Sequence, residues 1–160
     1  MFRDATRFEA NELPSSEALR EHVSVAMADQ PPTAWERSYP IISAYRGDER
    51  LGEAVVVEEL GKHRNMTFVV GVGMDGKVTG VAMMVYREGY GGEVRSDRFL
   101  SQYRGKKAAD GLVPGRDVRN ITGATLSAYA IGRGVKKAVA VAQYVRSAHD
   151  PMNPPITARH

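Results

Sequence analysis

The sequence predicts an α+β fold: a curved antiparallel sheet, a long C-terminal helix packed on it and an N-terminal helical arm. Short segments rich in β-branched residues and separated by polar turns fill residues 41 to about 88, and this spacing is typical of an antiparallel meander. A mostly apolar helical pattern then runs from about Thr125 to Tyr144. We expect the apolar face of this helix to pack across the sheet.

The composition is that of one globular domain with extensions. Of the 160 residues, 42% are hydrophobic and 26% are charged, and the absence of cysteine excludes disulfides, thiolate metal sites and a cysteine nucleophile. The net charge of +3 comes without a dense basic run, so nucleic-acid binding is not expected. No apolar stretch approaches the roughly 18 residues of a membrane span, so no direct membrane span is expected. Residues 1–8 lack the apolar core of a signal peptide.

Residues 1–40 are polar and interrupted by proline, and we interpret them as an arm rather than a domain. One helix is expected in this arm, over residues 15–27, with Ser15 or Ser16 as its N-cap. Three apolar residues recur every four positions and predict one buried stripe: Leu19, Val23 and Met27. The arm is expected to pack on the core or on a partner.

Residues 41–146 are interpreted as the main domain and residues 147–160 as an extended C-terminal tail. Four strands are expected in the main domain, at residues 41–45, 51–57, 66–72 and 78–85. Asp75 and Gly76 favour a tight hairpin turn between the last two of these strands.

The second half of the main domain is expected to be helical. A short helix at residues 98–103, capped by Ser96 or Asp97, precedes a loop at residues 106–120. Gly132 and Gly134 weaken the final helix by roughly 1 kcal/mol each relative to alanine. In return, these glycines permit close packing of the helix on the sheet.

Two features of the sequence, a glycine-rich match and the set of histidines, do not indicate a functional site. Residues 71–76 match G-x-G-x-x-G, but strand-like residues 77–85 follow where a dinucleotide-binding fold requires a helix. The four histidines are scattered without metal-ligand spacing, and no G-x-S-x-G elbow is present. We therefore expect no metal site and no catalytic residue.

The most informative stretch is residues 117–128, a loop that leads into the long helix. It delivers the hydroxyls of Thr122 and Thr125 to the start of the helix, where unpaired backbone N–H groups favour an anion. The small residues Gly123 and Ala124 leave room for a bulky group near the backbone. A phosphate at Thr125 would be held by helix N–H groups and by the hydroxyls of Thr122 and Ser127. The alternative is a plain N-cap, formed by Thr122 or Thr125, of an ordinary helix.

Residues 121–127 resemble the flavinylation motif of FMN-binding domains, [Ser/Thr]-Gly-Ala-Thr. Such domains occur in flavin subunits of the Na⁺-translocating NADH:quinone reductase and of the related Rnf complex. The resemblance extends to the hairpin at residues 70–81, to residues 86–94 and to the short helix at residues 99–105. In this family a flavin transferase uses FAD to esterify the phosphate of FMN onto the last threonine of the motif. The resemblance therefore implies covalent FMN attachment at Thr125.

The resemblance also implies a set of flavin contacts. A glycine-rich turn flanked by an aromatic residue and two acids can lie against a planar ring, although a solvated surface loop has the same composition. Further residues are plausible walls of the flavin site, but they are equally explicable as core or cap residues. The full set of expected contacts is Glu88, Tyr90, Gly91, Gly92, Glu93, Phe99, Gln102, Thr122, Gly123, Ala124, Leu126 and Ser127.

One position departs from the family pattern. Many members carry aspartate six residues before the modified threonine, where this chain has Arg119, and the nearest aspartate is Asp117. If that carboxylate helps the transferase, Arg119 would slow or abolish modification, and FMN would then be bound without a covalent bond or be absent. Arg119, Arg95 and Arg104 would favour the negatively charged reduced flavin.

The function implied by the resemblance is electron transfer within a larger respiratory or redox assembly, with a flavin transferase and redox subunits as partners. An extracytoplasmic or periplasmic location follows from the same resemblance. Two alternatives remain: a sensor or structural subunit without redox turnover, and a flavin-dependent reductase with its own small substrate.

Overall fold

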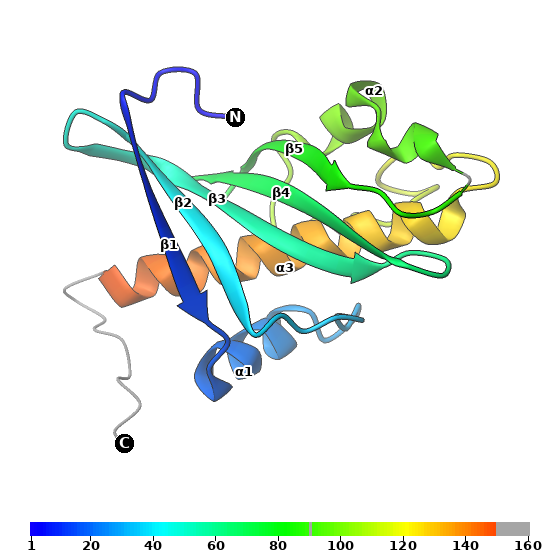
Figure 1. Cartoon of the computed structure of the whole chain (residues 1–160), viewed down its shortest axis with the longest axis horizontal. Helices are drawn as coiled ribbons and strands as arrows, with labels where there is room; N and C mark the ends of the chain where they lie inside the picture. Colours follow the sequence, from blue (N-terminus) through cyan, green and yellow to red (C-terminus); the bar gives the residue numbers. More distant parts are fainter. Residues whose placement is uncertain (90, 150–160) are drawn as a thin grey trace.

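A five-stranded antiparallel sheet crossed by one long helix forms the core of the computed structural model, which describes residues 1–89 and 91–149. The strands lie in chain order, and Figure 1 shows the helix α3 running across one face of the sheet. They are β1 (Arg7–Pro14), β2 (Ser38–Arg46), β3 (Glu49–Leu60), β4 (Asn65–Gly73) and β5 (Val78–Val85). The predicted α+β class and the predicted meander are therefore confirmed.

The strand β1 was not predicted. It lies within the region interpreted as an arm and pairs with β2 along its whole length, from Arg7 opposite Tyr45 to Pro14 opposite Ser38. Seven of its eight residues are exposed, and only Leu13 is partly buried. Because neither face of β1 is buried, its residues show no alternation of hydrophobic and polar side chains, which is the pattern that predicts a strand. Backbone hydrogen bonds to β2 hold it in the sheet.

The helix of the N-terminal region is present as α1 (Glu17–Ala26). Ser16 is its N-cap, since the Ser16 Oγ accepts a hydrogen bond from the backbone N–H of Leu19 at 3.2 Å. The predicted stripe is buried: Leu19, Val23 and Met27. This face packs against α3, so the helix belongs to the same core as the sheet.

The long helix α3 (Thr125–His149) extends beyond the predicted end at Tyr144. Val145 is buried, and Arg146 donates a hydrogen bond to the carbonyl of Met74 at 2.8 Å and lies 3.7 Å from the carboxylate of buried Glu53. These contacts with the sheet stabilise a final turn that has no apolar pattern of its own. Of the predicted tail, residues 150–160 lie outside the described residues.

A buried ionic cluster fastens the middle of α3 to the sheet. The Lys137 ammonium is fully buried and lies 2.8 Å from Glu59 Oε1 and 3.1 Å from Glu36 Oε1. It also donates to the carbonyls of Ala34 and Glu58, at 2.9 and 2.5 Å. A buried charge needs this degree of pairing to offset the cost of its dehydration.

Three short helices lie in chain order between β5 and the loop before α3. They are η1 (Gly92–Arg95), α2 (Asp97–Leu100) and η2 (Ser101–Tyr103). Ser96 caps α2 by accepting a hydrogen bond from the N–H of Phe99 at 3.2 Å, which confirms the predicted cap. Across residues 1–89 and 91–149, none of the helices combines the length and apolarity needed to span a bilayer.

Candidate functional site

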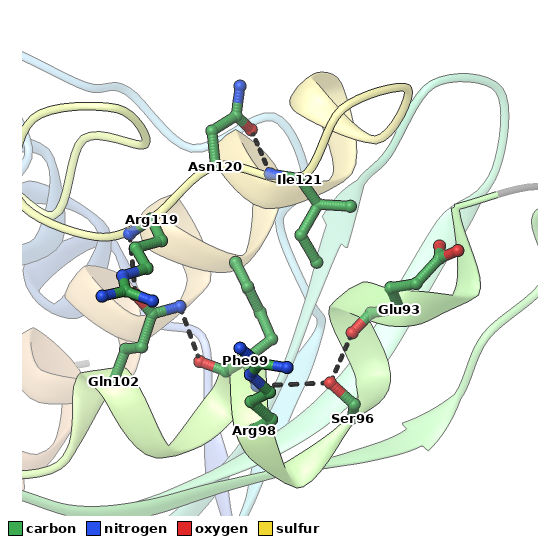
Figure 2. Close-up of a pocket in the computed structure, with 8 residues that line it drawn as sticks. All are labelled: Glu93, Ser96, Arg98, Phe99, Gln102, Arg119, Asn120 and Ile121. Carbon is green, nitrogen blue, oxygen red and sulfur yellow. Dashed lines mark hydrogen bonds between the residues drawn. The ribbon is translucent and has the colours of Figure 1, made fainter.

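A pocket of about 550 Å³ lies between the short helices and the loop that leads into α3. Figure 2 shows Ile121 projecting from the loop toward the helical segment that carries Phe99. The pocket combines an apolar wall with charged and amide side chains, and its volume lies in the range of small-molecule sites. Its lining residues are Glu93, Ser96, Arg98, Phe99, Gln102, Arg119, Asn120 and Ile121.

Gln102 joins the two walls of this pocket. Its Oε1 accepts a hydrogen bond from the backbone N–H of Arg119 at 2.7 Å, and its Nε2 donates to the carbonyl of Phe99 at 3.1 Å. Phe99 is buried and packs edge-on against Tyr103, with ring centroids 5.9 Å apart. Both polar ends of Gln102 are therefore engaged with the protein backbone, and the residue holds the loop in place.

Thr125 is the first residue of α3 and is exposed. Its Oγ1 accepts a hydrogen bond from Nδ2 of Asn120 at 3.0 Å. The turn before it is fixed by the left-handed Gly123, with φ of +82°, and by the N–H of Ala124, which donates to the carbonyl of Ile121 at 3.0 Å. This hydrogen bond links Thr125 to Asn120, a residue that lines the pocket.

The plain N-cap alternative does not describe this helix start. Ala124 holds the N-cap position, because its carbonyl accepts the N–H of Ala128 at 2.9 Å while the helix proper begins at Thr125. Alanine has no side-chain acceptor. Within residues 1–89 and 91–149, no side chain accepts a hydrogen bond from the backbone N–H of Thr125, Leu126 or Ser127. These N–H groups are available to an anion.

The predicted glycine-rich turn packs directly against Ala124, the residue before Thr125. Gly91 has φ of +76°, and a Cβ at Gly91 would lie only 2.8 Å from Cβ of Ala124. Gly92 opens η1, and the next residue of that helix, Glu93, lines the pocket. Tyr90 was also expected here, but it lies outside the described residues.

Glu88 and Ser127 are placed away from the pocket. Glu88 Oε1 accepts hydrogen bonds from the backbone N–H groups of His63 and Arg64, at 2.5 and 2.9 Å. These bonds hold the pKa of Glu88 below its usual value. Ser127 is buried, and its Oγ would lie 3.4 Å from a Cβ placed on Gly61. Both residues therefore face the turn between β3 and β4.

The remaining predicted contacts flank Thr125 at the surface. Thr122 and Gly123 are exposed in the turn, and Leu126 is 55% exposed on the first turn of α3. The structure thus brings Glu93, Phe99 and Gln102 to the pocket, whereas residues 122–127 are not among its lining residues.

Asp117 does not take the place of the aspartate that Arg119 replaces. Its Oδ2 accepts a hydrogen bond from the N–H of Val113 at 3.0 Å and another from Arg116 Nε at 3.2 Å. The bond from Val113, followed by Arg116, lowers the pKa of Asp117. Arg119 itself lines the pocket.

Four residues that line the pocket were not among the contacts predicted from the sequence: Ser96, Arg98, Asn120 and Ile121. Ser96 was predicted only as a helix cap. Asn120 and Ile121 stand beside the flavinylation motif, but no spacing rule predicts that an asparagine five positions upstream folds back onto Thr125.

The fold and this site define a flavin-binding domain, and the chain belongs to the FMN-binding domain family, whose profile matches residues 61–140. FMN is therefore the cofactor of this domain. The chain is also 32% identical over 105 residues to one of the subunits of the proton-translocating ferredoxin:NAD(+) oxidoreductase complex of Clostridium ljungdahlii. The alignment covers 61% of this chain, and the chain spans only about half, 56%, of that relative's length.

The residues present fit FMN. The uncapped first turn of α3 offers backbone donors for a phosphate, while Phe99 and Ile121 supply an apolar wall for a ring system. Arg98 and Arg119 add positive charge at the same pocket.

Proposed function

We propose that this chain is an electron-transfer module that carries FMN joined to Thr125 through a phosphoester bond. The proposal depends chiefly on one observation: Thr125, the exposed first residue of α3, is hydrogen-bonded through its hydroxyl to Asn120, which lines a pocket of about 550 Å³. The [Ser/Thr]-Gly-Ala-Thr motif at residues 122–125 supports the same residue as the attachment point.

Bound FMN supplies reversible redox chemistry that no amino-acid side chain provides. The backbone N–H groups of Thr125, Leu126 and Ser127, in the first turn of α3, would hold its phosphate. Phe99 and Ile121 would exclude water from the ring system in the pocket that they line. The guanidinium groups of Arg98 and Arg119, which line the same pocket, would stabilise negative charge on a reduced flavin.

Covalent attachment suits a carrier with an exposed site. A tethered cofactor has a high effective concentration at its pocket and is not lost on dilution. We propose that a flavin transferase installs it from FAD on the extracytoplasmic side of a membrane. We further propose that electrons pass through it between partner subunits of a larger redox assembly, as the name of the Clostridium relative suggests.

Intact mass spectrometry after co-expression with an FMN-attaching flavin transferase tests this function. The protein should gain the mass of one FMN less water, and Thr125→Val should abolish the gain. Thr6→Val, an exposed threonine that precedes β1 and lies outside the motif, is the matched control and should retain the gain. An unchanged mass in the wild-type protein, or label on Thr122, contradicts covalent attachment at Thr125.

The electron-transfer role is tested separately on the flavinylated protein. Reductive titration followed by reoxidation with an artificial acceptor should be reversible at the flavin absorbance. A protein that stays colourless after co-expression supports the sensor or structural alternative. Sustained turnover of a diffusible donor by the isolated protein supports the reductase alternative.

A further inference from the structure

We propose that Asn120 is a positioning residue that orients the Thr125 hydroxyl for its modification. The inference rests on the proposed attachment of FMN at Thr125. Its basis is the hydrogen bond from Asn120 Nδ2 to Thr125 Oγ1, 3.0 Å long, between residues five positions apart in the chain.

The direction of this bond determines which way the hydroxyl proton points. The amide nitrogen of asparagine only donates, so Thr125 Oγ1 accepts and its O–H is left to donate elsewhere. Within the part of the chain that the structure describes, no group accepts that O–H. The proton therefore faces solvent, where a base of an incoming enzyme can reach it.

The Asn120 side chain is itself held in place. Its Oδ1 accepts the backbone N–H of Ile121 at 2.9 Å, so both ends of the amide are engaged and its orientation is fixed. The preceding residue is also anchored, because the N–H of Arg119 donates to Gln102 at 2.7 Å. A threonine at a helix start has two accessible side-chain rotamers, and a preorganised donor selects one of them.

The modification makes use of this arrangement. Thr125 Oγ attacks the phosphorus on the riboflavin side of FAD held by the transferase, and the new Oγ–P bond forms as the anhydride P–O bond breaks. AMP leaves with the anhydride oxygen, and the threonine proton passes to a base of the transferase. The Asn120 N–H stabilises the negative charge that develops on Oγ as the proton departs. Once Oγ is an ester oxygen and a weaker acceptor, the same N–H is free to donate to the phosphate.

Two substitutions separate donation to Thr125 from support of the loop. Asn120→Asp keeps a carboxylate oxygen for the N–H of Ile121 but has no N–H to donate. Asn120→Ala loses both bonds. Asn11→Asp, in the exposed edge strand β1, is the matched control for the change of charge. Circular dichroism confirms that each variant folds.

Intact mass spectrometry follows the time course of FMN attachment in the presence of FAD and the transferase. The concentration of this protein, the acceptor, is varied to obtain a maximal rate and a half-saturating concentration. Asn120→Asp and Asn120→Ala should each lower the maximal rate by about tenfold or more. The half-saturating concentration of acceptor protein should change less than twofold, because Asn120 orients a reacting group rather than forming the docking surface. Asn11→Asp should match the wild type.

Several outcomes overturn the inference while leaving the proposed function intact. A wild-type rate for Asn120→Asp would show that Asn120 only supports the loop. A wild-type rate for Asn120→Ala would show that the hydrogen bond from Asn120 to Thr125 is unnecessary. A loss confined to the half-saturating concentration assigns Asn120 to docking. If the wild-type protein itself gains no FMN, both the proposed attachment and this inference fall.

Discussion

Gly134 of α3 lies directly against the ring of Phe68 in β4: a Cβ at Gly134 would stand 2.1 Å from the ring's Cζ. Both residues are buried, so this contact fixes how closely the helix approaches the sheet. The close packing predicted for the two helical glycines is confirmed for Gly134. Gly132 instead faces the loop, where its Cβ would lie 2.6 Å from the carbonyl oxygen of Leu112.

The substitution Gly134→Ala should destabilise the protein although alanine favours helix formation. The gain in helix propensity is about 1 kcal/mol, whereas overpacking a tight core typically costs about 1 to 3 kcal/mol. We expect a net loss of about 1 kcal/mol, seen in chemical denaturation at constant m-value. In a Phe68→Leu background the same substitution should cost less, because the smaller side chain leaves space. An equal cost in both backgrounds would show that Phe68 is not the cause.

The substitution Lys137→Met should be far more damaging than loss of an exposed lysine. It leaves buried Glu59 without its 2.8 Å partner and Glu36 without its 3.1 Å partner. Breaking a buried ion pair on one side costs about 3 to 5 kcal/mol. The free energy of unfolding measures the loss, and Lys62→Met in the exposed β3–β4 turn should change it by less than about 0.5 kcal/mol. A loss below about 1 kcal/mol for Lys137→Met would contradict this role.

The substitution Gln102→Leu should release the loop from the short helices. It removes the 2.7 Å bond to the N–H of Arg119 and the 3.1 Å bond to the carbonyl of Phe99. Since one such bond contributes about 1 kcal/mol, the Arg119 amide should exchange with solvent about fivefold faster. Amide hydrogen exchange by NMR checks this, with Gln143→Leu on α3 as the control. Unchanged exchange at Arg119 would show that other contacts hold the loop.

Stability below neutral pH should depend on Glu88. Hydrogen bonds from the backbone N–H groups of His63 and Arg64 lower the pKa of Glu88 from its ordinary value of 4.5. A lowered folded-state pKa adds stability that is fully present above the ordinary value and is lost as pH falls through the lowered one. Between about pH 6 and about pH 3, the wild type should therefore lose more stability than Glu88→Gln. Parallel pH profiles of the two proteins would contradict the assignment.

Strong local signals made much of the fold predictable. The β-branched segments of β2 to β5, the Asp75-Gly76 turn and the Ser96 cap each depend on short-range preferences, and the structure contains all of them. The strand β1 escaped prediction because its residues are exposed and its stability comes from pairing with β2. The end of α3 was also missed, since its last turn is stabilised by the contacts of Arg146 with Glu53 and Met74.

The residues of the candidate site also fall into those that the sequence predicted and those that it assigned wrongly or missed. The motif around Thr125 is contiguous, so the sequence alone pointed to the family and to the residue. Phe99 and Gln102 were foreseen as walls only through the resemblance, and the structure places both at the pocket. Glu88 and Ser127 were assigned to the same site, but their side chains turn toward the β3–β4 turn.

The sequence by itself determined the α+β class, the order of most elements and the threonine at the start of the last helix, because each is written in a short stretch of neighbouring residues. Only the tertiary structure decided that Asn120 contacts Thr125, that Gln102 clasps Arg119, and that Lys137 is buried among carboxylates. These relationships depend on side-chain directions and on which segments the fold brings together. Hydrogen bonds and ion pairs act over a few ångströms in space, and the order of residues along the chain does not specify that proximity.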